Sequence, residues 1–210
     1  MVGGLRRYAD ACPVCHSSAR ERLVWFWLSQ AGAGFRFADD IVVAHFAPEK
    51  GLSRRISAAA PRRYTAYDFE PSRYRHLDHV AAADLSALPM ADESVDLLIC
   101  NHVLEHVPDV ALALSQIRRV LRPGGVAILQ VPIALKLDAP IELAPESSAE
   151  ERIARVGQHD HLRLFTAPSY LAALEAAGFR VERYDAFAQT PREATGWRLD
   201  PFELLHLCWK

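Results

Sequence analysis

Apolar and polar residues alternate in blocks along this chain, so that strand-like runs are separated by helical ones. Residues 41–46 and 95–103 are continuous apolar runs, which are typical of strands buried on both faces. Residues 109–122 instead repeat apolar positions with helical spacing, and Pro123 to Gly125 end that pattern in a turn. The first five predicted strands are 41–46, 63–71, a short one ending at Asp84, 95–103 and 126–133. This alternation predicts an α/β protein with a doubly wound parallel sheet.

The C-terminal third departs from this alternation. Residues 134–165 lose the periodicity except for a short helix at 148–156, and we interpret them as an insertion that covers the pocket. Thr166 then caps a helix that Gly178 ends, and strands at 179–187 and 202–209 flank a polar loop. The full prediction is a Rossmann-like, doubly wound, seven-stranded sheet with a terminal antiparallel hairpin.

A helix precedes the sheet. Residues 17–31 have an apolar stripe, with Ser17 or Ser18 as the cap and Glu21 at the spacing of a capping box. Gly32 to Gly34 break this helix. We therefore divide the chain into an N-terminal segment, 1–35, and a main domain, 36–210, with the insertion at 134–165.

The composition narrows the class of partner. Half of the 210 residues are hydrophobic and the formal net charge is −2, which provides no electrostatic basis for binding nucleic acid or an anionic membrane. The first residues lack the apolar core of a signal peptide, and apolar runs stay shorter than the roughly 18 residues of a membrane span. We expect a cytoplasmic protein with a small-molecule ligand, and a homodimer stays open.

Two cysteines form a CPVC motif. The thiolates of Cys12 and Cys15 have the spacing that can bind one zinc ion, but they supply only half of a four-ligand site. His16 is a candidate third ligand and a partner chain could complete the set. The alternative is a dithiol turn without metal.

Candidate binding residues follow the predicted strands, because ligands of such sheets bind at the carboxyl ends of the strands. Asp68 ends the second strand, 17 residues beyond Gly51, where an acid can accept hydrogen bonds from both ribose hydroxyls; Glu70 is an alternative. Asp84 can accept from an adenine amino group while the backbone amide of Leu85 donates to a ring nitrogen.

One stretch resembles a known family. Residues 81–132 contain DLSALPM, the ADESVD turn, a strand leading into NHVLEHV, and LRPGG before another strand. In this order and spacing they resemble the centre of the class I S-adenosylmethionine-dependent methyltransferases that act on small molecules. The resemblance implies that Asp68 holds the ribose of the cofactor, that Asp84 and Leu85 hold the adenine, and that Asn101 and His102 form the rim of the methionine pocket. It also implies transfer of a methyl group to an oxygen, nitrogen or carbon atom.

The first turn, HFAPEKGL, departs from the family pattern, which has an acid and several glycines there. We expect a variant cofactor turn in which Ala47 is small, Glu49 binds the ligand's ammonium group and Gly51 supplies one flexible point. If the turn is too tight for a ligand, the chain is instead a non-catalytic binding or assembly subunit, with the CPVC segment and Trp25 to Trp27 as its contact surface. A nicotinamide-dependent oxidoreductase is disfavoured because GxGxxG is missing.

Histidines are frequent in the second half of the chain. His159, Asp160 and His161 precede Thr166, where a His-Asp pair could deprotonate an acceptor, hold the insertion in place, or bind a metal with a nearby carboxylate. His106 is interpreted as a structural residue at a helix start and His45 as a satisfied core residue. His76 and His79 are predicted on a solvated helix.

Overall fold

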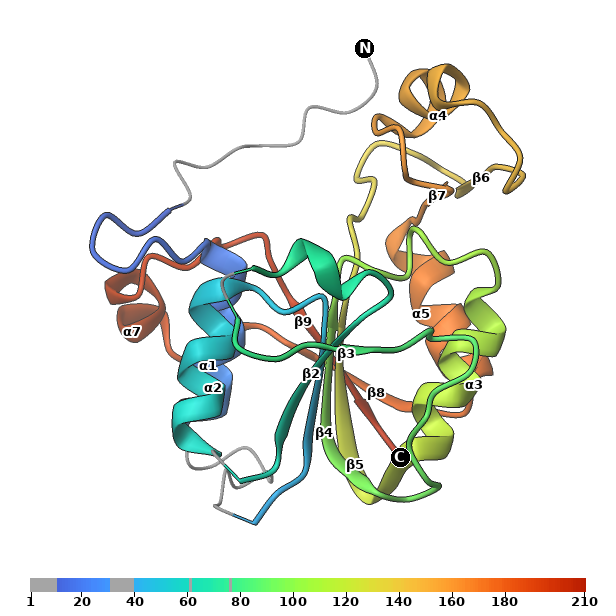
Figure 1. Cartoon of the computed structure of the whole chain (residues 1–210). Helices are drawn as coiled ribbons and strands as arrows, with labels where there is room; N and C mark the ends of the chain where they lie inside the picture. The colour runs from blue at the N-terminus through green and yellow to red at the C-terminus, as the bar shows by residue number, and fades with distance from the viewer. Residues whose placement is uncertain (1–10, 31–39, 61, 76) are drawn as a thin grey trace.

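The computed structural model describes residues 11–30, 40–60, 62–75 and 77–210. The predicted glycine break at 32–34, His76 and the first ten residues lie outside this range. Figure 1 shows one sheet between two groups of helices, with the insertion standing at the end of the sheet where the parallel strands finish.

The central sheet has seven strands in the order β3-β2-β1-β4-β5-β9-β8. Strands β1 to β5 pair in parallel, whereas β9 is antiparallel to both β5 and β8. The predicted doubly wound sheet with a terminal antiparallel hairpin is therefore confirmed. The strands are β1 (Val43–Phe46), β2 (Tyr64–Asp68), β3 (Ala81–Ala82), β4 (Val95–Asn101), β5 (Leu121–Gln130), β8 (Arg180–Tyr184) and β9 (Leu205–Trp209).

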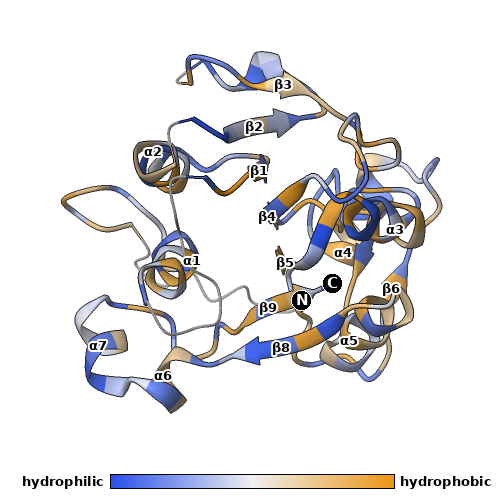
Figure 2. Ribbon diagram, turned by 90° about the horizontal axis from the view of Figure 1, so that it is seen from below, coloured by the Kyte–Doolittle hydropathy of each residue, from blue (hydrophilic) through white to orange (hydrophobic). Residues whose placement is uncertain are grey.

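Helices cover both faces of the sheet. One face carries α1 (Ala19–Ser29) and α2 (Lys50–Ala59), and the other carries α3 (Val110–Val120) and α5 (Ala167–Ala176). Figure 2, which views the sheet from below, shows these two layers on either side of the strands. Each layer buries its own apolar cluster: Leu114, Ile117 and Leu174 belong to one cluster, and Trp27 and Ile56 belong to the other.

Local sequence explains where the helices begin. Ser18 caps α1 and forms a capping box with Glu21, so Ser18 rather than Ser17 is the cap. Asp109 caps α3 by accepting from the amide of Leu112, and Thr166 caps α5. These caps confirm three predicted helix starts.

Several local sequence predictions were wrong. Strand β5 begins at Leu121, so Pro123 to Gly125 lie in the strand and not in the predicted turn before it. The segment predicted as a polar loop after β8 forms α6 (Ala186–Gln189) and α7 (Pro191–Gly196), because Asp185 caps the first and proline begins the second. The helix predicted before β3 is only a 3-10 turn, η1 (Pro71–Arg73), and His79 is not helical.

The insertion is more ordered than the sequence indicates. It contains the predicted helix, α4 (Ala149–Val156), capped by Ser148 and ended by Gly157 in a left-handed conformation. It also contains an antiparallel pair that was not predicted, β6 (Ile141–Glu142) with β7 (Arg163–Leu164). This strand pair joins the two ends of the insertion by backbone hydrogen bonds.

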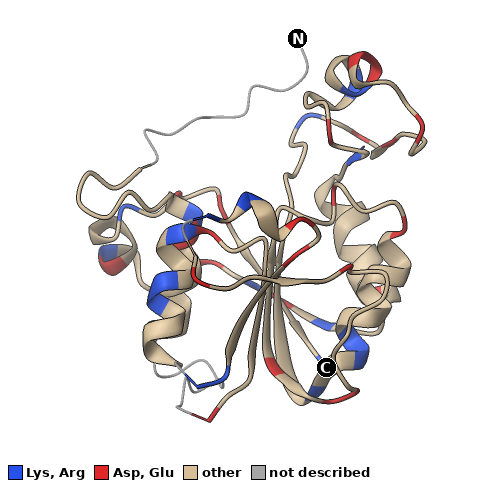
Figure 3. Cartoon of the chain, viewed as in Figure 1, with Lys and Arg blue, Asp and Glu red and all other residues tan. Residues whose placement is uncertain are grey.

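Basic residues and acidic residues are both spread along the ribbon (Figure 3). In the described part of the chain, none of the helices has the length and apolar character needed to cross a membrane.

Candidate active site

The carboxyl ends of three adjacent strands bring the predicted cofactor residues together. In the register of the sheet, Phe46 of β1 faces Tyr67 of β2 on one side and Cys100 of β4 on the other. The next residues along these strands, Ala47, Asp68 and Asn101, therefore lie side by side at one edge of the sheet.

The first turn replaces glycine with a strained alanine. Ala47 has a φ of 48°, in the left-handed region that favours glycine, and its amide donates to the carbonyl oxygen of Tyr67 at 3.0 Å. An alanine in this conformation costs about 1–2 kcal/mol, so the surrounding structure must hold the turn in place. The chain keeps the backbone shape of a glycine turn with a minimal side chain.

Glu49 is fixed by two neighbours. Its carboxylate lies 3.0 Å from Nε2 of His45 and accepts from the side-chain amide of Asn101 at 3.2 Å. Burial raises the pKa of Glu49, but the hydrogen bond and charge of His45 outweigh burial, so the pKa lies below its usual value. The Glu49 side chain is 19% exposed, which leaves an oriented anion at the edge of the sheet.

Two further observations concern the same neighbours. His45 is fully buried and its other ring nitrogen contacts the Tyr64 hydroxyl at 3.0 Å, which confirms it as a satisfied core residue. The Oδ1 atom of Asn101 is buried and has no hydrogen-bond partner among the described residues. A buried acceptor of this kind is free to receive a ligand's donor.

Asp68 already has protein partners. Its carboxylate accepts from the Glu70 amide at 2.7 Å and from the Tyr74 hydroxyl at 2.8 Å. Burial raises the pKa of Tyr74, and the hydrogen bond to Asp68 and the charges of Asp68 and Glu49 add to this, so the phenol stays protonated and donates. Tyr74 was not predicted as a site residue from the sequence.

Asp84 and Leu85 lie at the end of β3. Asp84 is exposed and its carboxylate accepts from the amide of Ser86 at 2.8 Å, while the side chain of Leu85 is buried. The acid is thus oriented by its own turn, and Leu85 anchors that turn in the core.

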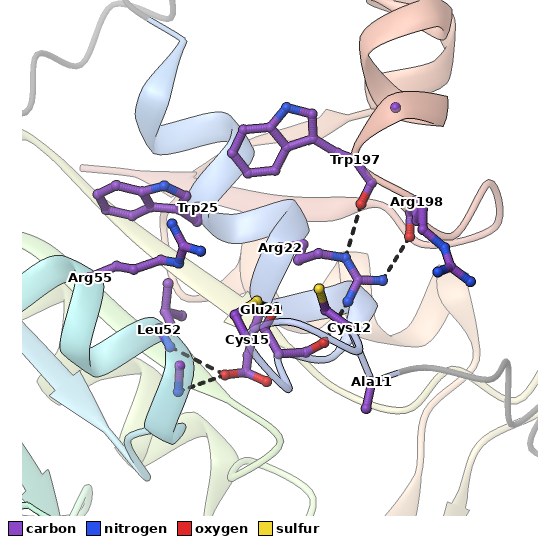
Figure 4. Close-up of a pocket in the computed structure, with 13 residues that line it drawn as sticks. Ala11, Cys12, Cys15, Glu21, Arg22, Trp25, Leu52, Arg55, Trp197 and Arg198 are labelled. Carbon is purple, nitrogen blue, oxygen red and sulfur yellow. Dashed lines mark hydrogen bonds between the residues drawn. The ribbon is translucent and has the colours of Figure 1, made fainter.

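Gly51 faces away from this group. It lies in α2, and a Cβ atom there would come within 2.7 Å of Oε1 of Glu21. That oxygen accepts from the amides of Gly51 and Leu52 at 3.0 and 3.2 Å, while Oε2 accepts from Ser18 at 2.7 Å. Figure 4 shows Glu21 of α1 directed at the start of α2. Glu21 therefore caps both helices, and Gly51 allows the close approach.

The CPVC segment forms a turn beside this contact. Cys15 is exposed and its thiol lies 3.0 Å from the Ser17 hydroxyl; bonds from the Ser17 side chain and backbone lower the pKa of Cys15 to about 6. The turn borders a cavity of about 260 Å³, which is shown in Figure 4 and also lined by Trp25 and Arg55. Among the described residues, no third ligand joins Cys12 and Cys15 in a group able to hold an ion.

The residues of the predicted His-Asp motif, His159 to His161, differ in their burial. The side chain of His159 is exposed, whereas His161 is buried. Burial lowers the pKa of His161, although the charge of Glu105 opposes this. Asp160 accepts through its backbone carbonyl from His106 at 3.0 Å, so His106 contacts the insertion instead of starting a helix.

These residues meet His102 and Glu105, which follow β4. His102 has a φ of 54°, and its Nδ1 atom lies 3.4 Å from the Glu105 carboxylate. Nε2 of His161 lies 4.0 Å from the same carboxylate oxygen. His102 and His161 were predicted as site residues and Glu105 was not, although the spacing HxxEH gives a local signal for it.

A second missed acid lies nearby. Glu203 accepts from the side-chain amide of Gln130 at 3.0 Å, and burial raises its pKa, opposed by the charge of His102. The two carboxyls differ in direction, because the pKa is lowered at Glu49 and raised at Glu203.

Comparisons with known proteins agree with this geometry. Residues 49–129 match the family model described as a methyltransferase domain. A protein of Mycolicibacterium smegmatis described as "Probable S-adenosylmethionine-dependent methyltransferase" is 30% identical over 140 residues, which cover 63% of this chain and 49% of that protein. The trans-aconitate 2-methyltransferase of Streptomyces coelicolor is 42% identical over 108 residues, covering 49% of this chain and 34% of the enzyme.

Solved structures support the fold independently. The crystal structure of an S-adenosylmethionine-dependent methyltransferase from Mesorhizobium loti is 18% identical, covers 85% of this chain and 94% of its own, and has a TM-score of 0.54. The chain spans about half or less of the length of the curated relatives described above. By its strand order the chain has the fold of the class I S-adenosylmethionine-dependent methyltransferases, and its residues 49–129 match the methyltransferase-domain family.

Proposed function

We propose that this chain binds S-adenosylmethionine at the carboxyl ends of β1, β2 and β4 and moves its methyl group to an oxygen, nitrogen or carbon atom of a small molecule. The observation that carries the proposal is the row formed by Ala47, Asp68 and Asn101 at adjacent strand ends. This is the position at which doubly wound sheets bind their ligands.

The fit to the cofactor rests on three side chains. Asp68 presents a carboxylate for the ribose hydroxyls. In the structure, one oxygen of this carboxylate accepts a hydrogen bond from the Tyr74 hydroxyl. Glu49 presents an oriented anion for an ammonium group. The unpartnered Oδ1 of Asn101 adds a buried acceptor beside it. Together they match a ligand with one cationic end and one hydroxyl-bearing ring.

Asp84, Leu85 and His102 keep the roles that the family resemblance implies. Asp84 would accept from the adenine amino group, the Leu85 amide would donate to the ring, and His102 would border the methionine end. Gly51 acts differently in the proposal: it shapes the turn by admitting Glu21 to the start of α2.

The reaction requires little from the protein beyond alignment. The cofactor supplies a methyl carbon activated by its sulfonium, so the residues around it must orient the acceptor and exclude water. A base is needed only where the acceptor's proton must leave. His161 and Asp160 lie on the insertion side, and Glu203, whose pKa is raised by burial, lies beside Gln130 at the end of β5.

The acceptor is proposed to be a small organic acid. The similarity to a trans-aconitate 2-methyltransferase over about half of the chain favours this class, and Nε2 of His102, which has no hydrogen-bond partner among the described residues, provides an imidazole donor for a carboxylate. Esterification of a carboxylate needs no base because the acceptor is already ionised.

The alternative is a non-catalytic binding or assembly subunit. One observation favours it: the first amides of α2 are already bonded to Glu21, so they are committed to the contact with α1. In that case the CPVC turn and α1 would form the contact surface.

The experiment is a methylation screen with small di- and tricarboxylic acids, with amines and phenols as comparison classes. We expect an ester one methyl group heavier than its acid, formed with stoichiometric S-adenosylhomocysteine. Cofactor binding without turnover on any class would contradict the acceptor class, and absence of cofactor binding would favour the assembly subunit.

A further inference from the structure

Five polar side chains meet between the loop after β4 and the insertion: His102, Glu105, His106, Asp160 and His161, which we call the His-Glu cluster. Ligand atoms of Glu105, His106 and His161 all lie within 4.8 Å of one another, and in the described part of the chain they form the one such group of metal-ligating side chains. The rings of His106 and His161 are 4.8 Å apart and nearly perpendicular.

Glu105 is the least expected member of the cluster. Its side chain is 1% exposed, and neither carboxylate oxygen has a hydrogen-bond partner in the described chain. A buried carboxylate in this state is costly unless a cation faces it. The nearest groups are the imidazoles of His102 and His161, at 3.4 and 4.0 Å.

The hydrogen bond of His106 defines which of its ring nitrogens is free to ligate. Nδ1 lies 3.0 Å from the carbonyl oxygen of Asp160, and because a carbonyl can only accept, Nδ1 carries the proton. Nε2 then holds the lone pair. Metal-binding histidines are typically oriented in this way, by donating the second ring N–H to a carbonyl or carboxylate.

Backbone contacts fix the two halves of the cluster against each other. The amide of Leu162 donates to the carbonyl oxygen of Glu105 at 2.9 Å. The guanidinium of Arg163 binds the carbonyls of Leu104, Val107 and Pro108 around the same turn. The cationic Arg163 is paired with Glu142 on its other side, so its ion pair does not involve Glu105.

We propose that Glu105, His106 and His161 bind a divalent transition-metal ion of the Zn²⁺ type. Two imidazole nitrogens and one carboxylate oxygen suit Zn²⁺ and its neighbours, whereas Mg²⁺ prefers oxygen ligands alone. Coordination bonds of about 2.1 Å require the three ligand atoms to approach one another by roughly an ångström. His102 then lies beside the carboxylate as an outer partner.

Three protein ligands leave a coordination position open. An acceptor bound beside His102, which lies 3.4 Å from Glu105, would place a carboxylate oxygen in this position. This role rests on the proposed function, whereas ion binding itself does not. Ion binding is therefore measured without cofactor or acceptor, so that the two proposals fail separately.

The test uses the untagged full chain after treatment with a chelator. Zn²⁺ is titrated in competition with a chromophoric chelator, on the wild-type protein and on a Cys12→Ser/Cys15→Ser background that removes the CPVC thiolates. We expect one Zn²⁺ per chain that survives removal of the cysteines. Loss of all stoichiometric binding on that background would overturn the proposal.

Single variants locate the ion. Loss of an outer-shell partner alone weakens metal binding by about 10–100-fold, so Glu105→Gln and His106→Gln should each weaken Zn²⁺ binding by more than about 100-fold. His79→Gln, at an exposed histidine outside the cluster, should leave it unchanged. Circular dichroism checks that each variant folds, and His106, which is one-third exposed, is the safer substitution. Unchanged affinity in His106→Gln, or tighter binding of Mg²⁺ than of Zn²⁺, would contradict the assignment.

Discussion

Arg163 joins the insertion to the loop after β4, and its replacement by methionine should loosen both. The side chain is 3% exposed and donates to the carbonyls of Leu104, Val107 and Pro108, as well as to Glu142. Hydrogen bonds from a charged donor contribute about 1.5–3 kcal/mol each, so three at the lower end amount to about 4.5 kcal/mol. In the variant, water can replace part of this hydrogen bonding at the carbonyls of Val107 and Pro108, which are only partly buried. We therefore expect Arg163→Met to lower the free energy of unfolding by about 3–4 kcal/mol.

The matched control is the other partner of the ion pair. The Glu142 side chain is 63% exposed, so Glu142→Gln should cost at most about 1 kcal/mol. Urea denaturation followed by circular dichroism measures both variants, and hydrogen exchange at the Leu162 amide detects local opening of the insertion. The reasoning is refuted if Arg163→Met costs less than about 1 kcal/mol in both assays, or if the two variants cost the same.

Three further predictions follow from the structure. Asp68→Ala should weaken S-adenosylmethionine binding by about 1–3 kcal/mol in calorimetry, and unchanged affinity would remove Asp68 from the site. Tyr74→Phe should strengthen this binding by up to about 1 kcal/mol, because the substitution frees one oxygen of the Asp68 carboxylate. Glu21→Ala leaves three amides without their acceptor and should lower the free energy of unfolding by about 2–3 kcal/mol in urea titrations, whereas a loss under about 1 kcal/mol would contradict its capping role. Burial lowers the pKa of His206 to about 4, with a contribution from Arg183, so the folded chain keeps this imidazole neutral while the unfolded chain protonates it near pH 6.5. The stability that depends on a neutral His206 is therefore present above pH 6.5 and is lost as the pH falls toward 4. Between pH 7 and pH 4.5, the free energy of unfolding of the wild type should fall by about 2.5 kcal/mol more than that of His206→Gln. Parallel pH profiles of the two proteins would refute this.

The sheet could be predicted because its strands and helices have strong local patterns. The buried runs at 41–46 and 95–103 correspond to β1 and β4, and Ser18, Asp109 and Thr166 cap helices as their spacing indicates. In contrast, β6 and β7 have two residues each, which is too short for periodicity to show. Their pairing depends on contacts across the insertion.

The site was predictable only as far as strand ends determine it. Asp68, Asn101 and Ala47 follow from the position of the strands alone. The bond of Glu21 to Gly51 spans 30 positions, and that of His106 to Asp160 spans 54, so neither leaves a local signal. The role of Gly51 was interpreted as flexibility for a ligand because the packing of α1 on α2 is invisible in the sequence.

The most direct test of the account is calorimetric titration of S-adenosylmethionine and S-adenosylhomocysteine into the purified chain, with NAD as the control. We predict saturable micromolar binding of both sulfur compounds, which corresponds to about −8 kcal/mol, and no binding of NAD. Absence of binding by either sulfur compound would mean that the HFAPEKGL turn excludes the ligand, and it would contradict the proposed cofactor site.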